Sequence, residues 1–366
     1  MPKIILLAGD GIGPEVTEEA QACLALLSLR CDLDIEFEAH DFGGIAIDRH
    51  GTPLPDATLA ACRGADAILL GAVGGPKWDG EKVRPEAGLL SLRTELGLFA
   101  NLRPGGSIPG LEILSPLKSS IAADSDILVV RELTGGAYFG EKSLDDDRAT
   151  DLCVYTRAEI ERIARVAFTA ARRRSKRVTS VDKANVLSTS KLWRKVVTEL
   201  ADEYPDVALD HLYVDAAAMA LVTNPRRFDV ILTENMFGDI LSDELAVIGG
   251  SIGLLGSASI GESGPGLFEP IHGSAPDIAG LDIANPAGAI AAASMLLDQA
   301  LGLPDMARIL DEAIELTLRD GIRTADLGGS ARCSEFGDQV RAHLDARLGK
   351  RDALLELIAM NRGCCG

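Results

Sequence analysis

The chain has 366 residues, 47% of them hydrophobic, which is enough apolar material for one large domain or two domains with a sizeable core. Its formal net charge of -19 repels phosphate backbones and anionic lipids, which argues against general nucleic-acid or membrane-surface binding. An anionic ligand would therefore need a local cluster of arginines.

Seven cysteines occur without a CxxC pair and without histidines at zinc spacing, which predicts reduced thiols in a cytoplasmic protein. The apolar run at residues 4–8 has no preceding basic region and is shorter than a signal-peptide core. The most apolar expected helix, at residues 287–297, is well below membrane-spanning length. We expect a soluble protein without a targeting segment.

The first third of the chain alternates between strand and helix patterns. Residues 4–8 predict a buried strand, and residues 9–15 a tight turn into a helix that begins near Pro14. Neither Gly9 nor Gly11 begins a GxGxxG motif, so the turn is not a Rossmann fingerprint. Further strands are expected at 35–39 and 67–70, with helices after Pro55 and through 89–96. This alternation predicts a mostly parallel α/β sheet.

The middle of the chain interrupts the alternation with a polar segment. After a strand at 127–131, residues 134–155 are too polar for a core but alternate at both ends, which predicts a protruding β arm that pairs with a second subunit. The alternation then resumes, with helices expected at 157–174 and 187–204 and strands at 177–181 and 208–214.

The last third is expected to contain less regular structure. Residues 251–280 are rich in glycine and proline and are expected to form a loop. Two closing helices should begin at Ala287 and Pro304, and residues 349–366 are expected to form a loosely attached tail.

Residues 228–250 predict a buried strand followed by a helix that carries two acidic residues on one face. Asp239 and Asp243 are four residues apart, so their carboxylates repel by a few tenths of a kcal/mol. A hard divalent cation, which prefers oxygen ligands, would offset this repulsion. A solvated acidic face is the alternative that the spacing leaves open.

Other charged residues at element ends are candidates for the same site. Arg93, Arg103 and Arg131 can form forks for the carboxylates of a small polyacid, or they can be ordinary surface arginines. Lys183 follows a buried strand, where partial desolvation suits a general base, although a lysine that reaches into solvent is the alternative. Asp215 also follows a strand and offers either a third metal oxygen or a helix N-cap.

The loop at residues 269–280 is interrupted by glycine and proline and carries hydrogen-bonding groups throughout. Such a loop can wrap an adenosine, with Asp277 accepting from the ribose hydroxyls and repelling a 2′-phosphate. His272 by itself is equally compatible with an ordinary loop histidine.

Together these segments resemble the isocitrate/isopropylmalate dehydrogenase family of β-decarboxylating dehydrogenases. The resemblance rests on the number, order and spacing of motifs that run through nearly the whole chain. They are GDGIGPE (9–15), GAVGGPKWD (71–79), RPEAGLLSLR (84–93), NLRP (101–104), VREL (130–133), TGGAYFGE (134–141), VDKANVL (181–187), VDAAAM (214–219), TENMFGDILSDE (233–244) and EPIHGSAPDIAG (269–280).

The resemblance implies a two-domain α/β fold with a mostly parallel sheet, a cofactor site that is not of the Rossmann type, and a β arm at a dimer interface. A discontinuous cofactor-binding domain would comprise residues 1–98 and 251–366. Residues 99–250 would form the substrate, metal and dimerisation domain.

The resemblance also assigns roles to the candidate residues. Mg²⁺ or Mn²⁺ would be held by Asp239 and Asp243 of one subunit and by Asp215 of the other, so the homodimer would share its active sites. Lys183, also from across the interface, would remove a proton, and Tyr138 would donate one. The substrate contacts are expected to be Arg93, Arg103, Arg131, Asp215, Leu89 and Leu90. The NAD contacts are expected to be Gly75, Glu86, His272, Gly273, Ser274, Ala275, Pro276, Asp277, Ile278 and Asn285.

The activity implied by the resemblance is the NAD-dependent oxidative decarboxylation of 3-isopropylmalate to 4-methyl-2-oxopentanoate in leucine biosynthesis. Leu89 and Leu90 suit an isopropyl group, whereas a third carboxylate, as in isocitrate, would lose solvation against them. Another alkylmalate, malate or tartrate is the alternative substrate. A catalytically silent regulatory subunit is the alternative of a different class, but such a subunit would be expected to have lost a catalytic group, and none is missing here.

Overall fold

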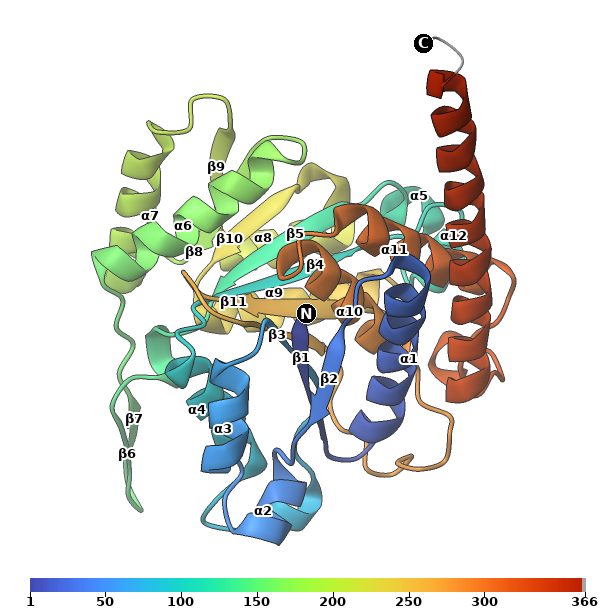
Figure 1. Ribbon diagram of the computed structural model, residues 1–366. Helices are drawn as coiled ribbons and strands as arrows, with labels where there is room; N and C mark the ends of the chain where they lie inside the picture. Colours follow the sequence, from blue (N-terminus) through green and yellow to red (C-terminus); the bar gives the residue numbers. More distant parts are fainter. Residues whose placement is uncertain (364–366) are drawn as a thin grey trace. The chain divides into compact units, whose positions relative to one another are not determined.

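In the computed structural model, which describes residues 1–363, the chain forms two compact units (Figure 1). One unit is discontinuous and comprises residues 1–90 and the chain from residue 265 onward, and the other comprises residues 91–264. The borders therefore fall at 90/91 and 264/265 rather than at the expected 98/99 and 250/251.

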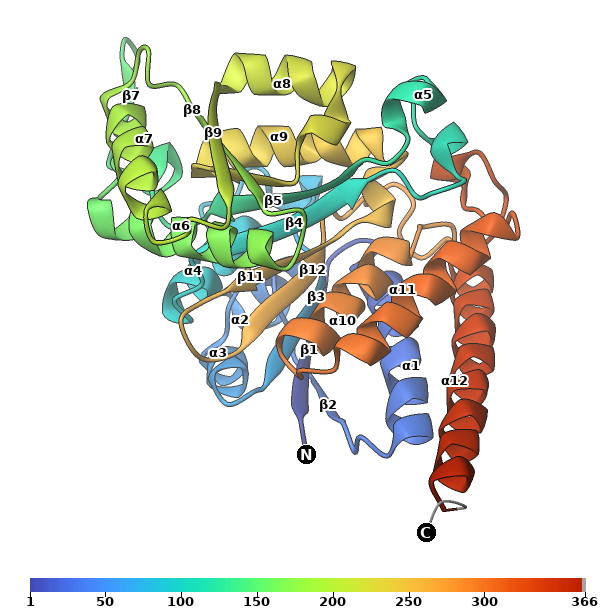
Figure 2. The same cartoon turned by 90° about the horizontal axis from the view of Figure 1, so that it is seen from above.

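The discontinuous unit contains a parallel sheet with the strand order β2-β1-β3-β12. Helices α1 and α10 pack on this sheet, and α11 and α12 pack against them (Figure 2). The strands are β1 (Lys3–Gly9), β2 (Glu36–Ala39), β3 (Ala67–Ala72) and β12 (Gly266–Pro270). The helices are α1 (Gly13–Cys31), α2 (Gly44–His50), α3 (Asp56–Arg63), α10 (Ala287–Gln299), α11 (Pro304–Arg319) and α12 (Cys333–Gly363), and α4 (Pro85–Glu95) crosses the border between the units.

The second unit contains a sheet with the order β11-β4-β5-β10-β8-β9, which is parallel except that β4 runs antiparallel to both of its neighbours. Helices α8 and α9 lie on one face of this sheet, and α6 and α7 lie on the other (Figure 2). The strands are β4 (Ala100–Gly106), β5 (Asp126–Glu132), β8 (Arg177–Asp182), β9 (Ala208–Tyr213), β10 (Val230–Thr233) and β11 (Gly256–Ile260). The helices are α5 (Ser119–Ala122), α6 (Arg157–Arg172), α7 (Ser188–Ala201), α8 (Val214–Thr223) and α9 (Asn235–Ile248).

The α/β architecture predicted from the alternation is confirmed, including the strand-to-helix segment β10–α9. The apolar residues of β10 are fully buried between β5 and β8, which explains why a run without alternation is stable there. On α9, Leu241, Leu245 and Ile248 recur at helical spacing and pack into the core of the second unit together with Ile127 and Val129 of β5. Because this apolar face of α9 is buried, Asp239 and Asp243 lie on a different face of the helix, where arginines contact them.

The polar segment before α6 contains the predicted β arm. Strands β6 (Lys142–Leu144) and β7 (Ala149–Asp151) form a two-stranded antiparallel ribbon that is separate from the larger sheet of their unit (Figure 1). Leu144 on this ribbon is 85% exposed within the single chain.

Two predictions for the last third are wrong. Residues 251–280 contain β11 and β12, which form because β11 pairs with β4 and β12 with β3, partners that are distant in sequence. Residues 349–363 are helical, because α12 continues through them, and the segment is attached at Asp352, which Arg30 of α1 contacts. Residues 364–366, which complete the expected tail, lie outside the described residues.

Strand β4 was not predicted, and Arg103 lies within it rather than at an element end. None of the helices in the described part of the chain combines the length and apolarity needed to cross a membrane.

Candidate active site

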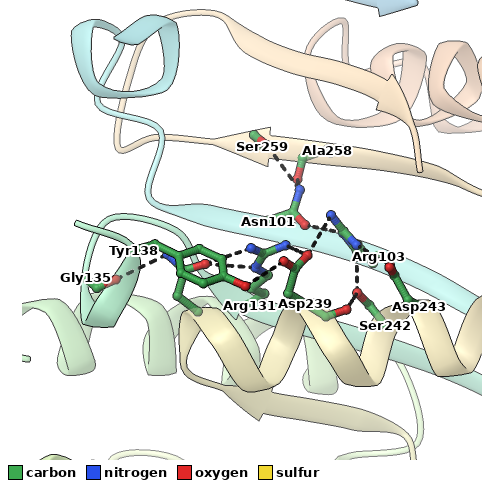
Figure 3. A network of polar contacts seen from close by, with 11 residues as sticks. Asn101, Arg103, Arg131, Gly135, Tyr138, Asp239, Ser242, Asp243, Ala258 and Ser259 are labelled. Atoms are coloured by element: carbon green, nitrogen blue, oxygen red, sulfur yellow. Dashed lines mark hydrogen bonds and ion pairs between the residues drawn. The ribbon is translucent and has the colours of Figure 1, made fainter. Parts of the chain in front are cut away.

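Arg131 lies at the centre of a polar network on the second unit (Figure 3). It comes near the end of β5, and its side chain passes beneath α9, where it is only 5% exposed. Gly238 makes this passage possible, because a Cβ at that position would lie 2.6 Å from Cγ of Arg131. The guanidinium donates to Asp239 and, from Nε and Nη2, to Oδ1 of Asn235 at 3.1 and 2.8 Å. The buried arginine is therefore held on two sides by α9.

Arg103 on β4 approaches the next turn of the same helix. Its Nη1 donates to Ser242 Oγ at 2.8 Å and to Asp243 Oδ1 at 3.1 Å, and its Nη2 lies 3.8 Å from Asp239. Both carboxylates of the acidic face are thus within reach of one guanidinium. The alternative of a merely solvated acidic face does not describe this arrangement.

The three predicted arginines lie near one another. Burial lowers the pKa of Arg131 to about 10, and the positive charges of Arg103 and Arg93 contribute to the lowering, opposed by Asp239. Because like charges at close range repel one another, this cluster is suited to an anion that carries more than one carboxylate.

Tyr138 joins the network from the loop that follows β5. The carboxylate of Glu132 accepts hydrogen bonds from the backbone N–H groups of Thr134 and Gly135 at 2.7–3.0 Å and so fixes the start of this loop. The phenol of Tyr138 donates to Asp239 Oδ2 at 3.0 Å. Burial and the adjacent Asp239 carboxylate raise the pKa of Tyr138, so its phenol keeps its proton at neutral pH.

Lys183 and Asp215 form a second cluster, apart from the acidic face of α9. Lys183 directly follows β8 and is ion-paired with Asp215 in the first turn of α8, and their side chains are 27% and 60% exposed. Buried Asp182 fixes the turn by accepting from the backbone N–H of Ala184 at 2.8 Å and from Arg194. Within the described residues, no group of three or more histidine, cysteine or acidic side chains is placed to hold a metal ion. One chain thus brings together two of the three predicted metal ligands and leaves the third beside the lysine.

The predicted cofactor loop lies in the discontinuous unit, where it is bonded to the first turn of the chain. The N–H of Ile12 donates to the carbonyl of Ser274 at 2.8 Å. Gly11 has a φ of +58°, and a Cβ there would lie 1.9 Å from that carbonyl oxygen, so only glycine permits the contact. Ala275 has a φ of +36°, a conformation that non-glycine residues adopt mainly where function or packing enforces it.

His272 in this loop has an unused hydrogen-bonding atom. Its Nδ1 lies 2.9 Å from the carbonyl of Gly273 and must carry the ring proton to bond with it. Nε2 is consequently an acceptor, and it is buried without a partner. Burial lowers the pKa of His272, which keeps the ring neutral. The loop thus fits a ligand that supplies a hydrogen-bond donor, such as a nucleotide.

The other predicted cofactor and apolar contacts lie in the same unit. Asp277 is exposed, whereas Asn285 is buried and accepts a hydrogen bond from the N–H of Ala287, the first residue of α10, at 3.0 Å. The remaining residues belong to the loop, to the turn after β3 or to the start of α4. They are Gly75, Glu86, Leu89, Leu90, Gly273, Pro276 and Ile278.

Sequence reasoning missed two buried asparagines, Asn101 and Asn235, and the supporting Ser242. Their signal is weak, because a polar residue beside a candidate arginine or aspartate is common in any loop or element end. Only their contacts in the folded chain distinguish them.

Known proteins resemble this chain over nearly its whole length. Residues 3–340 match the family described as isocitrate/isopropylmalate dehydrogenase. The 3-isopropylmalate dehydrogenase of Staphylococcus saprophyticus is 56% identical over 343 residues, which cover 93% of this chain and 99% of that protein. The 3-isopropylmalate dehydrogenase of Anaeromyxobacter dehalogenans is 53% identical over 349 residues, with coverage of 93% and 99%.

Solved structures give the same result at lower identity. Isocitrate dehydrogenase from Methylococcus capsulatus is 37% identical with a TM-score of 0.83, over 94% of this chain and 99% of that one. A β-decarboxylating dehydrogenase from Thermococcus kodakarensis is 39% identical with a TM-score of 0.80, over 94% and 97%. The chain belongs to the isocitrate/isopropylmalate dehydrogenase family.

Proposed function

We propose that this protein catalyses the NAD-dependent oxidative decarboxylation of 3-isopropylmalate to 4-methyl-2-oxopentanoate, a reaction of leucine biosynthesis. Its relatives in Staphylococcus saprophyticus and Anaeromyxobacter dehalogenans are named for the same substrate. The observation that carries the proposal is that Arg103 and Arg131 contact the carboxylates of Asp239 and Asp243 directly. Groups that bind anions and groups that bind a hard cation therefore meet at one place, as a 2-hydroxy acid with two carboxylates requires.

The side chains of the two units have distinct tasks in this proposal. Arg93, Arg103 and Arg131 bind the substrate carboxylates, and Leu89 and Leu90 offer apolar surface to the isopropyl group. A bound Mg²⁺ or Mn²⁺ supplies a Lewis acid that lowers the pKa of the 2-hydroxyl group. The donor set fits such an ion, since Asp239 and Asp243 offer only carboxylate oxygens.

The proton transfers are assigned to two residues of the second unit. Lys183, in its neutral amine form, would accept the proton of the 2-hydroxyl, and hydride would pass from carbon 2 to NAD⁺. Loss of CO₂ then leaves an electron pair at carbon 3, which Tyr138 protonates. Its position supports this role, because the phenol carries a proton at neutral pH and lies in the network of Asp239 and Arg131.

A homodimer is part of the proposal. Lys183 and Asp215 lie together but outside the network of Asp239 and Asp243, so a second chain is the natural source of the missing groups. Helices α8 and α9 also carry exposed apolar side chains that a partner would cover, namely Met219, Val222, Met236, Ile240 and Val247. We further propose a cytoplasmic location, which the free thiols of the five described cysteines support.

The direct test is the appearance of NADH when the purified protein is mixed with 3-isopropylmalate, NAD⁺ and Mg²⁺. We expect turnover that falls to background when a chelator removes the metal and returns when excess Mg²⁺ is added. Malate, tartrate and other alkylmalates serve as comparison substrates. A higher kcat/KM with any of them than with 3-isopropylmalate would refute the substrate assignment.

Cofactor choice is tested at Asp277, which is exposed on the predicted NAD loop. Replacing it with lysine exchanges repulsion of a 2′-phosphate for attraction, so we expect the ratio of kcat/KM for NADP to that for NAD to rise by about tenfold to a hundredfold. Asp298→Lys, at an exposed position near the end of α10, makes the same charge change outside the loop and should leave the ratio unaltered. An equal ratio in wild type and Asp277→Lys would remove this residue from the ribose site.

A further inference from the structure

Two buried asparagines accept hydrogen bonds from the side chains of Arg103 and Arg131, and Figure 3 labels the first of them, Asn101. Nε of Arg103 donates to Oδ1 of Asn101 at 2.7 Å. Nε of Arg131 donates to Oδ1 of Asn235 at 3.1 Å. Asn101 accepts from Nε of Arg103 alone, whereas Asn235 accepts from both Nε and Nη2 of Arg131. The nitrogens that remain, Nη1 of Arg131 and both outer nitrogens of Arg103, are directed at the acidic face of α9.

The orientation of both amides is fixed by their other ends. Nδ2 of Asn101 donates to Ser259 Oγ at 3.1 Å and to the carbonyl of Ala258 at 3.4 Å. Nδ2 of Asn235 donates to the carbonyl of Gly135 at 3.2 Å. Because a carbonyl oxygen cannot donate, the amide NH₂ must face these groups and the amide oxygen must face the arginine. Both asparagines are almost completely buried, at 0% and 2% exposure, so water does not compete for these bonds.

An aspartate has the same shape as an asparagine and would make stronger, charge-assisted bonds to a guanidinium. It would also neutralise the arginine and leave its two oxygens facing the carbonyl groups that now accept from Nδ2. The neutral amide therefore makes a weaker hydrogen bond than a carboxylate would, but the positive charge of the arginine stays available to another anion.

We propose that Asn101 and Asn235 are positioning residues, which orient the two arginines toward the carboxylates of the substrate while leaving the guanidinium charge unneutralised. This inference rests on the proposed function, since it assigns the anion to the same site. It adds two residues that touch neither substrate nor metal and act only through the arginines.

The test uses Asn101→Asp and Asn235→Asp in the full-length protein with saturating Mg²⁺. The dissociation constant of 3-isopropylmalate is measured by titration calorimetry, kcat and KM by NADH formation, and Tm by calorimetry. We expect each substitution to weaken substrate binding and raise KM by about tenfold to a hundredfold, with a smaller change in kcat, because a neutralised arginine loses binding to the ground and transition states alike. Asn224→Asp, at an exposed position after α8, makes the same charge change in the same unit and should leave all these values near those of wild type.

A second pair of variants separates charge from position and covers the case in which an aspartate variant does not fold. Asn101→Ser and Asn235→Ser remove the amide oxygen without adding charge, so the arginine keeps its charge and loses its orientation. These variants should also weaken substrate binding severalfold. Binding within twofold of wild type in either folded variant of a given asparagine would overturn the assignment of that residue.

If a variant instead had a lower Tm and a lower kcat with an unchanged KM, the asparagine would only stabilise the fold. Failure of the proposed function is recognised separately, because wild type itself would then show no turnover of 3-isopropylmalate.

Discussion

Lys183→Met is expected to reduce kcat by about a hundredfold to ten-thousandfold, the usual contribution of a positioned general base. Methionine matches the length of the lysine stem but cannot accept a proton from the substrate hydroxyl. The turn that carries this residue is fixed by Asp182, so the substitution should leave the fold of the site intact. The measurements are kcat from NADH formation and the dissociation constant of 3-isopropylmalate from titration calorimetry, and only kcat should change greatly.

The matched control is Lys195→Met, because Lys195 is an exposed lysine on α7 whose nearest acidic group is Glu199, at 3.9 Å. Lys195→Met also removes one ammonium group from the same unit, and it should leave kcat unaltered. A kcat for Lys183→Met within tenfold of wild type would exclude Lys183 as the base. A large loss of substrate affinity would instead assign Lys183 to binding.

Mixing two inactive variants is expected to restore activity if the active site is shared between subunits. Lys183→Met retains Asp239, and Asp239→Asn retains Lys183, so one site of a mixed dimer receives both intact residues and the other receives neither. After complete subunit exchange, about a quarter of all sites should be intact, since half of the dimers are mixed. The measurement is kcat per site before and after exchange, with mixed dimers counted by differently tagged chains.

The structure supplies a demanding control for this experiment. Lys183 and Asp215 are ion-paired within one chain, so both would be contributed by the same subunit. A mixture of Lys183→Met with Asp215→Asn should therefore remain inactive, because neither site of the mixed dimer is complete. Recovery in this control, or no recovery in the first mixture despite proven exchange, would contradict the proposed sharing.

The acidic helix α9 could be predicted because the residues that determine it are close together in the sequence. Apolar residues at helical spacing, among them Leu241 and Leu245, predict the helix, and the i,i+4 spacing places Asp239 and Asp243 on one face of it. The same holds for the strand before Lys183 and for the turn into α1. In each case the determining residues are close together in the chain, so periodicity and turn chemistry suffice.

Elements that depend on distant partners could not be predicted in this way. Strand β11 reads as GSASI, a run of small residues that is strand only because it pairs with β4. The attachment of α12 at Asp352 was likewise not predictable, because its partner, Arg30 of α1, lies 322 residues earlier in the chain.

The sequence by itself therefore determined the α/β class, the position of the acidic helix and the set of charged residues from which a site can be built, because these follow from local periodicity and residue chemistry. Tertiary structure alone decided which of those charges meet. It placed Arg103 and Arg131 on the acidic helix, left Lys183 beside Asp215, and held Arg103 through Asn101, whose anchor Ser259 is 158 residues away in the chain. Contacts of that range depend on how strands pair and pack, which no short pattern of residues encodes.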